Sequence, residues 1–245
     1  IECDYCLLLN SDVRVEKGWL KPMLDYMNSH PTTAACQPKI RSEWSPDMLE
    51  YAGACGGYIG RLGFPFCRGR ILGTVEHDNG QYDNITTIAW ATGASLLIRR
   101  DIYLNVGGLD ARFFAHQEEI DLCWRLRSRG YDIVCIPESV VYHVGGGTLP
   151  KESPRKAYLN FRNNLLLLYK NLPEKQFRIV MFWRRLLDMA AALHFLAGGH
   201  WAACRAVIQA HIDFRRIHKD FQTDRDTNLA ATIVPPEQIL SPINL

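Results

Sequence analysis

Apolar and polar positions follow two different periods in the first 144 residues, one typical of buried strands and one typical of helices. Residues 6–9 form a continuous apolar run, CLLL, which ends abruptly in the short polar residues Asn10-Ser11-Asp12. Apolar residues then recur at helical spacing through positions 19, 20, 23, 24 and 27. Further strand-like runs cover residues 85–90, 95–98, 133–136 and 140–144. Short apolar runs of this kind indicate buried strands, and strands mixed with helical segments predict an α/β fold.

The rest of the chain has other patterns. Residues 177–219 carry apolar positions at helical spacing and predict two helices separated by a break at Gly198-Gly199. Residues 222–245 contain three prolines and little periodicity, so we expect a loose tail. Residues 42–80 are rich in Gly, Pro and aromatic residues without a clear period, and we expect a variable covering loop there.

An acidic cluster lies between an aromatic pair and an amphipathic segment, in the run FFAHQEEIDLCWRLRSR at 113–129. Glu118, Glu119 and Asp121 would repel one another unless a cation, a proton or a substrate group shares them. A preceding Gly-Gly turn and the closing Gly130 predict that these acids begin a helix, where the helix dipole favours the ionised form. One interpretation is a general base. The other is an acidic first helical turn with an Asp121–Arg125 surface pair.

Asp12 directly follows the first predicted strand. Open α/β sheets bind ligands just beyond the carboxyl ends of their strands, and a carboxylate there suits Mg²⁺ or Mn²⁺ on a diphosphate. The alternative is a polar turn in which the Asn and Asp side chains cap the backbone. His143 raises a similar choice, because an imidazole completes a carboxylate metal site or simply bonds to backbone in a half-buried strand. The glycine run 145–147 beside it would let a phosphate approach the backbone.

Taken together, LLNSD and the later run ATGASLLIRRD…GGLDARFFAHQEEIDLCWRLRSRGY resemble family 2 glycosyltransferases, and most closely their rhamnosyltransferase-like members. The resemblance extends from residue 4 to about 171. It implies a partial GT-A fold, in which a mixed sheet is flanked by helices and followed by a C-terminal helical extension. It further implies a metal site at Asp12 with His143, for Mg²⁺ or Mn²⁺. Here the family's Asp-X-Asp motif reads Asn10-Ser11-Asp12, so one carboxylate is missing.

The same resemblance assigns roles to other residues. The family has a Glu-Asp pair before a helix, whose second acid deprotonates the acceptor hydroxyl; here the pair reads Glu118-Glu119, so Glu119 is the predicted base and Glu118 the alternative. Small residues and an aromatic near the break at residues 92–94 line the donor or acceptor sugar. The predicted donor- or acceptor-binding residues are Asn10, Asp12, Trp90, Gly93, Ala94, Asp121, Arg155 and Arg162. For Trp90 a core position is an equal alternative.

Charge is unevenly distributed, although the formal net charge is only +2. Residues 151–219 carry 13 Lys/Arg against four Asp/Glu. Arg155, Lys156 and Arg162 in this segment are candidates to meet the phosphate of a donor or of a lipid-diphosphate acceptor, or else belong to a solvated helix face. The basic amphipathic helices suit an anionic membrane surface, with a packed helical hairpin as the alternative. Nucleic acid is not an expected partner, because the aromatic residues lie among aliphatic ones at core spacing.

Composition is ordinary for one large domain, with 245 residues, of which 47% are hydrophobic and 22% charged. Eight cysteines are scattered through apolar runs and indicate reduced core thiols. We therefore expect a cytoplasmic protein, peripheral on the inner face of the cell membrane if the basic helices bind it. No apolar run reaches the length of about 18 residues that a membrane-spanning helix requires.

We predict three parts: residues 1–171 as the catalytic portion, 172–221 as the basic helical extension and 222–245 as the tail. The chain reaches a core strand within a few residues of its start, so we expect a longer enzyme whose nucleotide-binding β-α-β region precedes this portion. The sheet would then have an exposed edge or face where those strands should pack, and the portion alone would bind donor poorly or not at all. The predicted function is inverting sugar transfer from a nucleotide-diphospho-sugar to a glycan or lipid-linked acceptor in bacterial surface polysaccharide synthesis. The alternatives are a non-catalytic sugar-binding or membrane-docking module, and a metal-dependent hydrolase or phosphotransferase.

Overall fold

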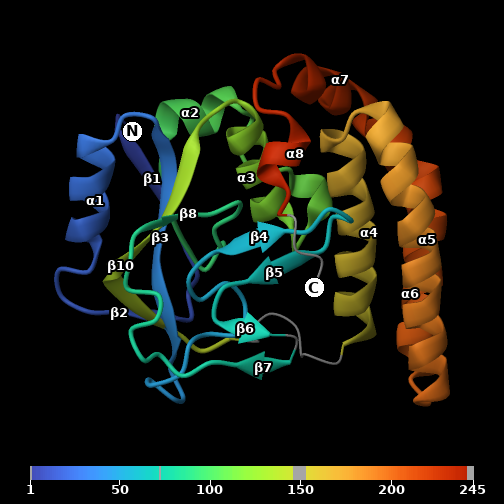
Figure 1. The fold of residues 1–245 in the computed structure, drawn as a ribbon, viewed down its shortest axis with the longest axis horizontal. Coiled ribbons are helices and arrows are strands. Elements are labelled where there is room, and N and C mark those ends of the chain that lie inside the picture. The colour runs from blue at the N-terminus through green and yellow to red at the C-terminus, as the bar shows by residue number, and fades with distance from the viewer. Residues whose placement is uncertain (1, 72, 146–152, 242–245) are drawn as a thin grey trace.

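The computed structural model describes residues 2–71, 73–145 and 153–241, and its centre is a six-stranded mixed sheet (Figure 1). The strands follow the order β1-β9-β3-β10-β2, and β8 pairs with β10 off this path. Only β3 and β10 run parallel to each other; the other pairs in this sheet are antiparallel. The strands are β1 (Tyr5–Leu9), β2 (Val13–Val15), β3 (Thr33–Ser42), β8 (Thr86–Thr87), β9 (Ser95–Arg99) and β10 (Asp132–His143). The α/β class and the mixed sheet were both predicted from the sequence.

Helices cover both faces of this sheet. On one face lies α1 (Leu20–Ser29), whose Met23 and Met27 are fully buried against Cys36, Leu97 and Val134. On the other face lie α3 (Glu118–Ser128) and α4 (Pro154–Asn171), and the short α2 (Arg100–Asn105) follows β9. The central strands β3, β9 and β10 bury apolar side chains on both faces, which is why β9 and β10 read as continuous apolar runs.

The long strand β10 differs from the sequence prediction of two short strands separated by Pro137-Glu138. It continues through both residues, and its register against β3 shifts between Ile136 and Val140. Proline lacks a backbone donor, so the ladder is interrupted there by an irregularity and the strand itself goes on. The predicted strand at residues 85–90 is also shorter than expected, since only Thr86–Thr87 pair as β8.

Residues 42–80 contain short hairpins instead of a featureless loop. They are formed by β4 (Gly57–Ile59) with β5 (Pro65–Cys67) and by β6 (Arg70–Ile71) with β7 (Thr74–Val75). The segment is fastened to the sheet by Lys39, which is almost fully buried and pairs with Asp78 and Asp83. A buried ammonium of this kind requires carboxylate partners to offset its desolvation.

The C-terminal part is helical and packs on the rest of the chain. The predicted helix pair is present as α5 (Glu174–Ala197) and α6 (Trp201–Ile217), and α4 runs along α6 (Figure 1). Core residues of α4 and α6 belong to the same apolar cluster as α3 and the sheet, so the predicted boundary at 171/172 does not separate two cores.

The prediction of a loose tail from residue 222 is wrong for the described residues. They form α7 (Gln222–Ala230) and α8 (Pro236–Ile239), with Arg225, Asn228 and Ile239 buried. Arg225 donates to the carbonyl of Tyr169, and Ser241 N donates to Ile59 O at 2.7 Å. Pro235 and Pro236 begin α8, and long-range contacts supply the order that local periodicity does not reveal. Residues 242–245 of the predicted tail lie outside the described part.

β1 forms one edge of the sheet, where Leu7 and Leu9 are 36% and 42% exposed. The predicted exposed edge is therefore present, and the preceding nucleotide-binding segment that we offered as its cause stays a prediction. Within the described ranges, no helix combines the length and the apolar character that crossing a membrane requires.

Candidate active site

Asp12 and His143 come together at one end of the sheet, although 131 residues separate them in the sequence. His143 ends β10 and pairs with Val13 of β2, and Asp12 immediately precedes β2. His143 Nε2 lies 3.2 Å from Asp12 Oδ1, and Val144 N donates to Asp12 O. Burial alone would lower the pKa of His143, but the carboxylates of Glu50 and Asp12 outweigh it and raise the pKa. The two residues predicted as metal ligands are thus neighbours.

The donor set fits a divalent cation that is completed by substrate. A carboxylate oxygen and an imidazole nitrogen that bind one ion at about 2.1 Å in adjacent positions lie about 3 Å apart, close to the separation seen here. In the part of the chain that the structure describes, no group of three or more His, Cys, Asp or Glu side chains is arranged to hold a metal. Mg²⁺ is commonly bound by one or two protein side chains, with phosphate oxygens and water in its remaining coordination positions.

The break between β8 and β9 lies beside this pair. Asn10 N donates to Ala94 O, and Thr92 N donates to the side chain of Gln37, which is fully buried on β3. A Cβ placed on Gly93 would lie 3.9 Å from Glu119 Cβ, so this backbone faces the acidic cluster. The contacts therefore join the end of β1, the small-residue break and the start of α3 in one region.

Trp90 does not line this region. It is 5% exposed, its Nε1 donates to Tyr58 O, and its ring fills the space where a Cβ on Gly57 would stand. The prediction of a sugar-binding Trp90 is not supported, and the alternative of a core aromatic describes its position. The sequence could not decide between these two roles, because aromatic side chains occur both in protein cores and in sugar-binding sites.

Glu118 and Glu119 open α3 as predicted, and the turn glycines Gly107 and Gly108 and the C-terminal Gly130 all have positive φ. Each glutamate keeps some exposure, but Oε2 of each is buried and has no hydrogen-bond partner among the described residues. Burial, reinforced by the charge of Glu118, raises the pKa of Glu119 to about 8, and burial raises the pKa of Glu118. At these two residues burial therefore opposes the preference of the helix dipole for the ionised form.

The segment before the acids has an unusual backbone. Phe114, His116 and Gln117 have φ values of 68°, 69° and 71°, a region that non-glycine residues rarely occupy. Asn163 of α4, fully buried, donates from Nδ2 to the carbonyls of residues 113, 115 and 116 at 2.7–3.0 Å. Backbone strain that is held by surrounding contacts is typical of functional sites.

Asp121 has a different role from the one predicted. Its side chain is fully buried and is bound by Arg125, Lys170 and Asn171 at 2.8–3.0 Å. Burial would raise the pKa of Asp121, but these partners lower it. Binding of donor or acceptor by Asp121 is therefore not supported, and the predicted surface pair with Arg125 is a buried one.

The two predicted phosphate-binding arginines differ. Arg162 donates from Nη2 to the carbonyls of Arg112 and Phe113 and pairs with the Asn163 side chain, so it holds the strained segment. Arg155 is exposed and lies over the ring of Phe114, with its guanidinium carbon 4.9 Å from the ring centroid. Arg155 thus remains a candidate for phosphate. The glycines at 146 and 147 lie outside the described residues.

Comparison with known proteins agrees with this geometry. A scan against models of known protein families finds no match. The chain is 31% identical over 147 residues to N-acetylglucosaminyl-diphospho-decaprenol L-rhamnosyltransferase of Mycobacterium tuberculosis, a stretch covering 57% of this chain and 47% of that protein. It is 24% identical over 140 residues to rhamnosyltransferase WbbL of Escherichia coli K12, covering 57% of the chain and 52% of the relative. The chain is related to glycosyltransferases.

The fold of the present chain is of the GT-A type. Its structure resembles that of GalNAc-T7, solved with UDP, GalNAc and Mn²⁺, with a TM-score of 0.50 and 12% identity, covering 70% of the chain and 32% of that protein. At this identity the likeness concerns the fold alone. The chain spans about half the length of the curated rhamnosyltransferases that it matches.

Proposed function

We propose that the chain carries the metal-binding and acceptor-activating part of an inverting glycosyltransferase. The enzyme would move a sugar from a nucleotide-diphospho-sugar to a glycan or lipid-linked acceptor in bacterial surface polysaccharide synthesis. The observation that carries the proposal is the buried Oε2 of Glu119, which has no hydrogen-bond partner among the described residues. It lies beside the Gly93 backbone, in the region that Asn10 and Ala94 connect to Asp12 and His143. The similarity to rhamnosyltransferases supports it.

The proposed chemistry is a single displacement. Glu119 takes the proton of the acceptor hydroxyl as that oxygen attacks the sugar carbon, and a base with a pKa near the working pH suits the task. The Gly93–Ala94 backbone leaves room for the sugar, since no side chain projects from Gly93. Attack opposite the leaving diphosphate inverts the configuration at the sugar carbon.

Asp12 and His143 are the residues that would hold a divalent cation, either Mg²⁺ or Mn²⁺. When bound, such a cation neutralises the charge that develops on the departing diphosphate. The GalNAc-T7 structure contains Mn²⁺ with UDP, which supports a divalent cation in this fold. Of the basic residues predicted to meet phosphate, Arg155 is exposed and Lys156 is half-buried, and both remain candidates for a direct phosphate contact.

A transfer assay separates this proposal from its rivals. A panel of labelled nucleotide sugars is offered together with diphosphate-linked acceptors, and we expect a glycosidic product of inverted configuration. Release of free sugar with every acceptor would instead indicate a hydrolase. Glycan binding without turnover of any donor would indicate a non-catalytic module.

We further propose that α5 rests on the anionic cytoplasmic face of the membrane that carries a lipid-linked acceptor. Ile179, Phe182, Trp183, Leu186 and Leu193 of α5 are 50–64% exposed and recur at helical spacing. Lys175, Arg178 and Arg185 are exposed on the same helix. An apolar stripe bordered by basic residues is complementary to anionic lipid.

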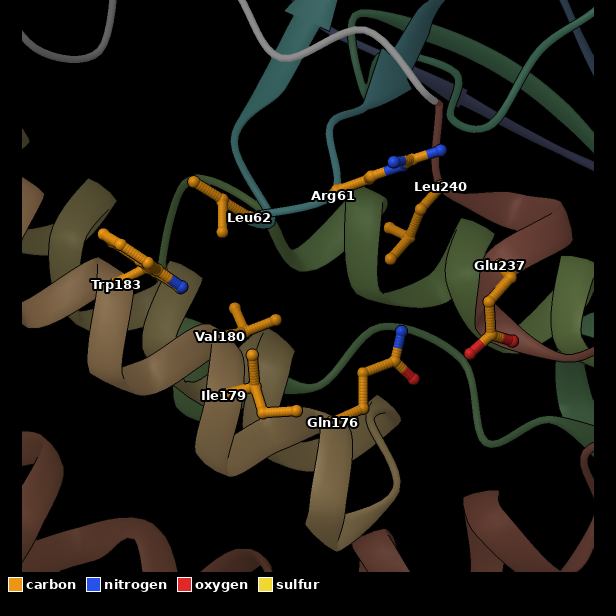
Figure 2. A pocket seen from close by; sticks show the side chains of 8 residues that line it. All are labelled: Arg61, Leu62, Gln176, Ile179, Val180, Trp183, Glu237 and Leu240. Carbon is orange, nitrogen blue, oxygen red and sulfur yellow. The ribbon is translucent and has the colours of Figure 1, made fainter.

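The apolar stripe leads into a pocket of about 500 Å³ between α5, α8 and the turn after β4. Figure 2 shows Ile179, Val180 and Trp183 of α5 on one side of it, with Arg61 and Leu62 on the facing loop. Arg184 of α5 does not belong to this surface. Arg184 is 1% exposed, pairs with Asp188 and lies over the ring of Phe64, so it belongs to the interior.

Liposome co-sedimentation tests the membrane proposal. We expect binding to phosphatidylglycerol vesicles that falls as salt rises from roughly 50 to 500 mM, because each basic residue near an anionic surface contributes about 1 kcal/mol. Replacing Arg178 and Arg185 by Gln should weaken binding, whereas the same change at exposed Lys17 and Lys21 should not. Equal binding by both double variants would contradict a role for α5.

A further inference from the structure

His143 lies between two carboxylates, one at each ring nitrogen. Nε2 faces Asp12, and Nδ1 lies 3.5 Å from Oε1 of Glu50, an electrostatic contact just beyond an ordinary hydrogen bond. Glu50 is 5% exposed and comes from the segment after β3, which the sequence left without an assigned role. A buried carboxylate with an imidazole beside it constrains where the ring proton resides.

Contacts other than the one with His143 hold Glu50 in place. Its Oε2 accepts a hydrogen bond from Ala52 N, and its backbone N donates to Ile40 O at 3.0 Å. Gly145 closes over it, since a Cβ at that position would lie 3.2 Å from Glu50 Oε1. The backbone of His143 is fixed as well, by pairing with Val13 and Ser42 on its two sides. His143 is also only 8% exposed, so its ring has little room to turn away from Glu50.

We propose that Glu50 is a positioning residue, whose carboxylate holds the proton of His143 on Nδ1 so that Nε2 directs its lone pair toward Asp12 and the cation that both would bind. This inference rests on the proposed metal site. Histidines that bind metals generally donate their other ring N–H to a carboxylate or carbonyl, which fixes the tautomer and the ring orientation. Glu50 is the carboxylate placed for that role here, and the Gly145 backbone leaves space for it.

The primary test measures the affinity for Mn²⁺ by electron paramagnetic resonance. Removal of such a carboxylate typically costs 10–100-fold in metal affinity, so we expect Glu50→Gln to weaken Mn²⁺ binding about tenfold. Gln retains the size of Glu and an oxygen that accepts from Ala52 N. The matched control is Glu43→Gln, since Glu43 lies nearby but pairs with Arg14. Unchanged Mn²⁺ affinity in Glu50→Gln would overturn the inference.

A double-mutant cycle shows whether Glu50 acts through His143. In a His143→Gln background, Glu50→Gln should have no further effect on Mn²⁺ affinity, because the ring that it positions is gone. An equal, additive loss in both backgrounds would mean that Glu50 merely supports the fold, and the inference would fail.

A second measurement separates this inference from the metal site itself. Nitrogen NMR of the His143 ring, recorded at a pH above the end of its titration in the same spectra, reports the tautomer directly. We expect the fraction with the proton on Nδ1 to fall severalfold in Glu50→Gln. If the parent protein binds no Mn²⁺, the proposed metal site fails, and the tautomer still decides the role of Glu50. An unchanged tautomer would rule that role out.

Discussion

Glu119 and Asp121 lie two residues apart on the first turn of α3, and both carry buried carboxylate oxygens, yet their environments are opposite. Asp121 is surrounded by Arg125, Lys170 and Asn171, which lower its pKa. Glu119 has an oxygen without a hydrogen-bond partner among the described residues, and its pKa is raised to about 8. A fully partnered acid stabilises the fold, whereas an acid left without partners is available for a substrate. Within one helical turn, Asp121 therefore supports the fold and Glu119 is the residue available for chemistry.

The strongest test of this comparison is Glu119→Gln. We expect turnover to fall about 10²-fold or more with donor affinity nearly unchanged, because Gln cannot accept the acceptor proton. Steady-state kinetics and donor-binding calorimetry measure the two quantities. Glu118→Gln should have a milder effect, and Glu138→Gln on the exposed side of β10 serves as the matched surface control. Turnover equal to that of the parent would remove Glu119 from the mechanism.

Asp121→Asn should act on stability instead. Removing one partner from a buried ion pair leaves an uncompensated charge, which typically costs 3–5 kcal/mol. We expect a loss of about 3 kcal/mol in the free energy of unfolding, measured in urea, since Lys170 keeps its second partner Asp110. The control is Asp132→Asn, which removes the partly exposed pair with Arg127 and should cost less than about 1 kcal/mol. A similar loss in both variants would contradict the assigned role of Asp121.

The comparison also shows what the sequence could and could not reveal. Periodicity predicted β1, β9 and the helices α3, α5 and α6, because apolar side chains recur regularly along each of them. It could not reveal that most of those of α5 are exposed. The acidic cluster was recognised, but spacing alone could not distinguish a surface Asp121–Arg125 pair from a buried one. That distinction depends on Lys170, which lies 49 residues further along the chain and arrives only through the packing of α4.

Other site residues were missed for similar reasons. Glu50 lies in a segment without a period, and its relation to His143 exists only in three dimensions. Asn163 and Asn164 are buried in the middle of α4, directly before its apolar run Leu165–Leu168. Asparagine is unfavourable in helix interiors, so this pair was the one available signal that α4 binds polar groups of another segment.

Asn163→Ala tests whether the strained backbone at residues 114–117 holds Glu119 in the position where its Oε2 has no hydrogen-bond partner among the described residues. Each such residue costs about 1–3 kcal/mol, which the three Asn163 hydrogen bonds help to offset. Without them the segment should relax and shift Glu119, and we expect turnover to fall about tenfold. Asn160→Ala on the same helix is the control, because only its backbone carbonyl contacts Gln117. Unchanged turnover in Asn163→Ala would separate the strain from catalysis.

The smallest expected effect is a difference in how stability depends on pH. The folded-state pKa of Glu119 lies near 8, above the ordinary value of 4.5, so the folded protein retains a proton that the unfolded chain releases. Its contribution to stability is therefore complete below about pH 4.5 and is lost as the pH rises to about 8. Asp121 behaves in the opposite way, because its lowered pKa contributes stability above about pH 4 that is lost only on further acidification.

Urea unfolding from about pH 5 to 9 measures this contribution. Relative to the parent, the free energy of unfolding of Glu119→Gln should rise by about 1 kcal/mol or more across this range, with the difference greatest at the alkaline end. A constant difference across this range would mean that Glu119 is already ionised in the folded protein, and the contrast with Asp121 would not hold.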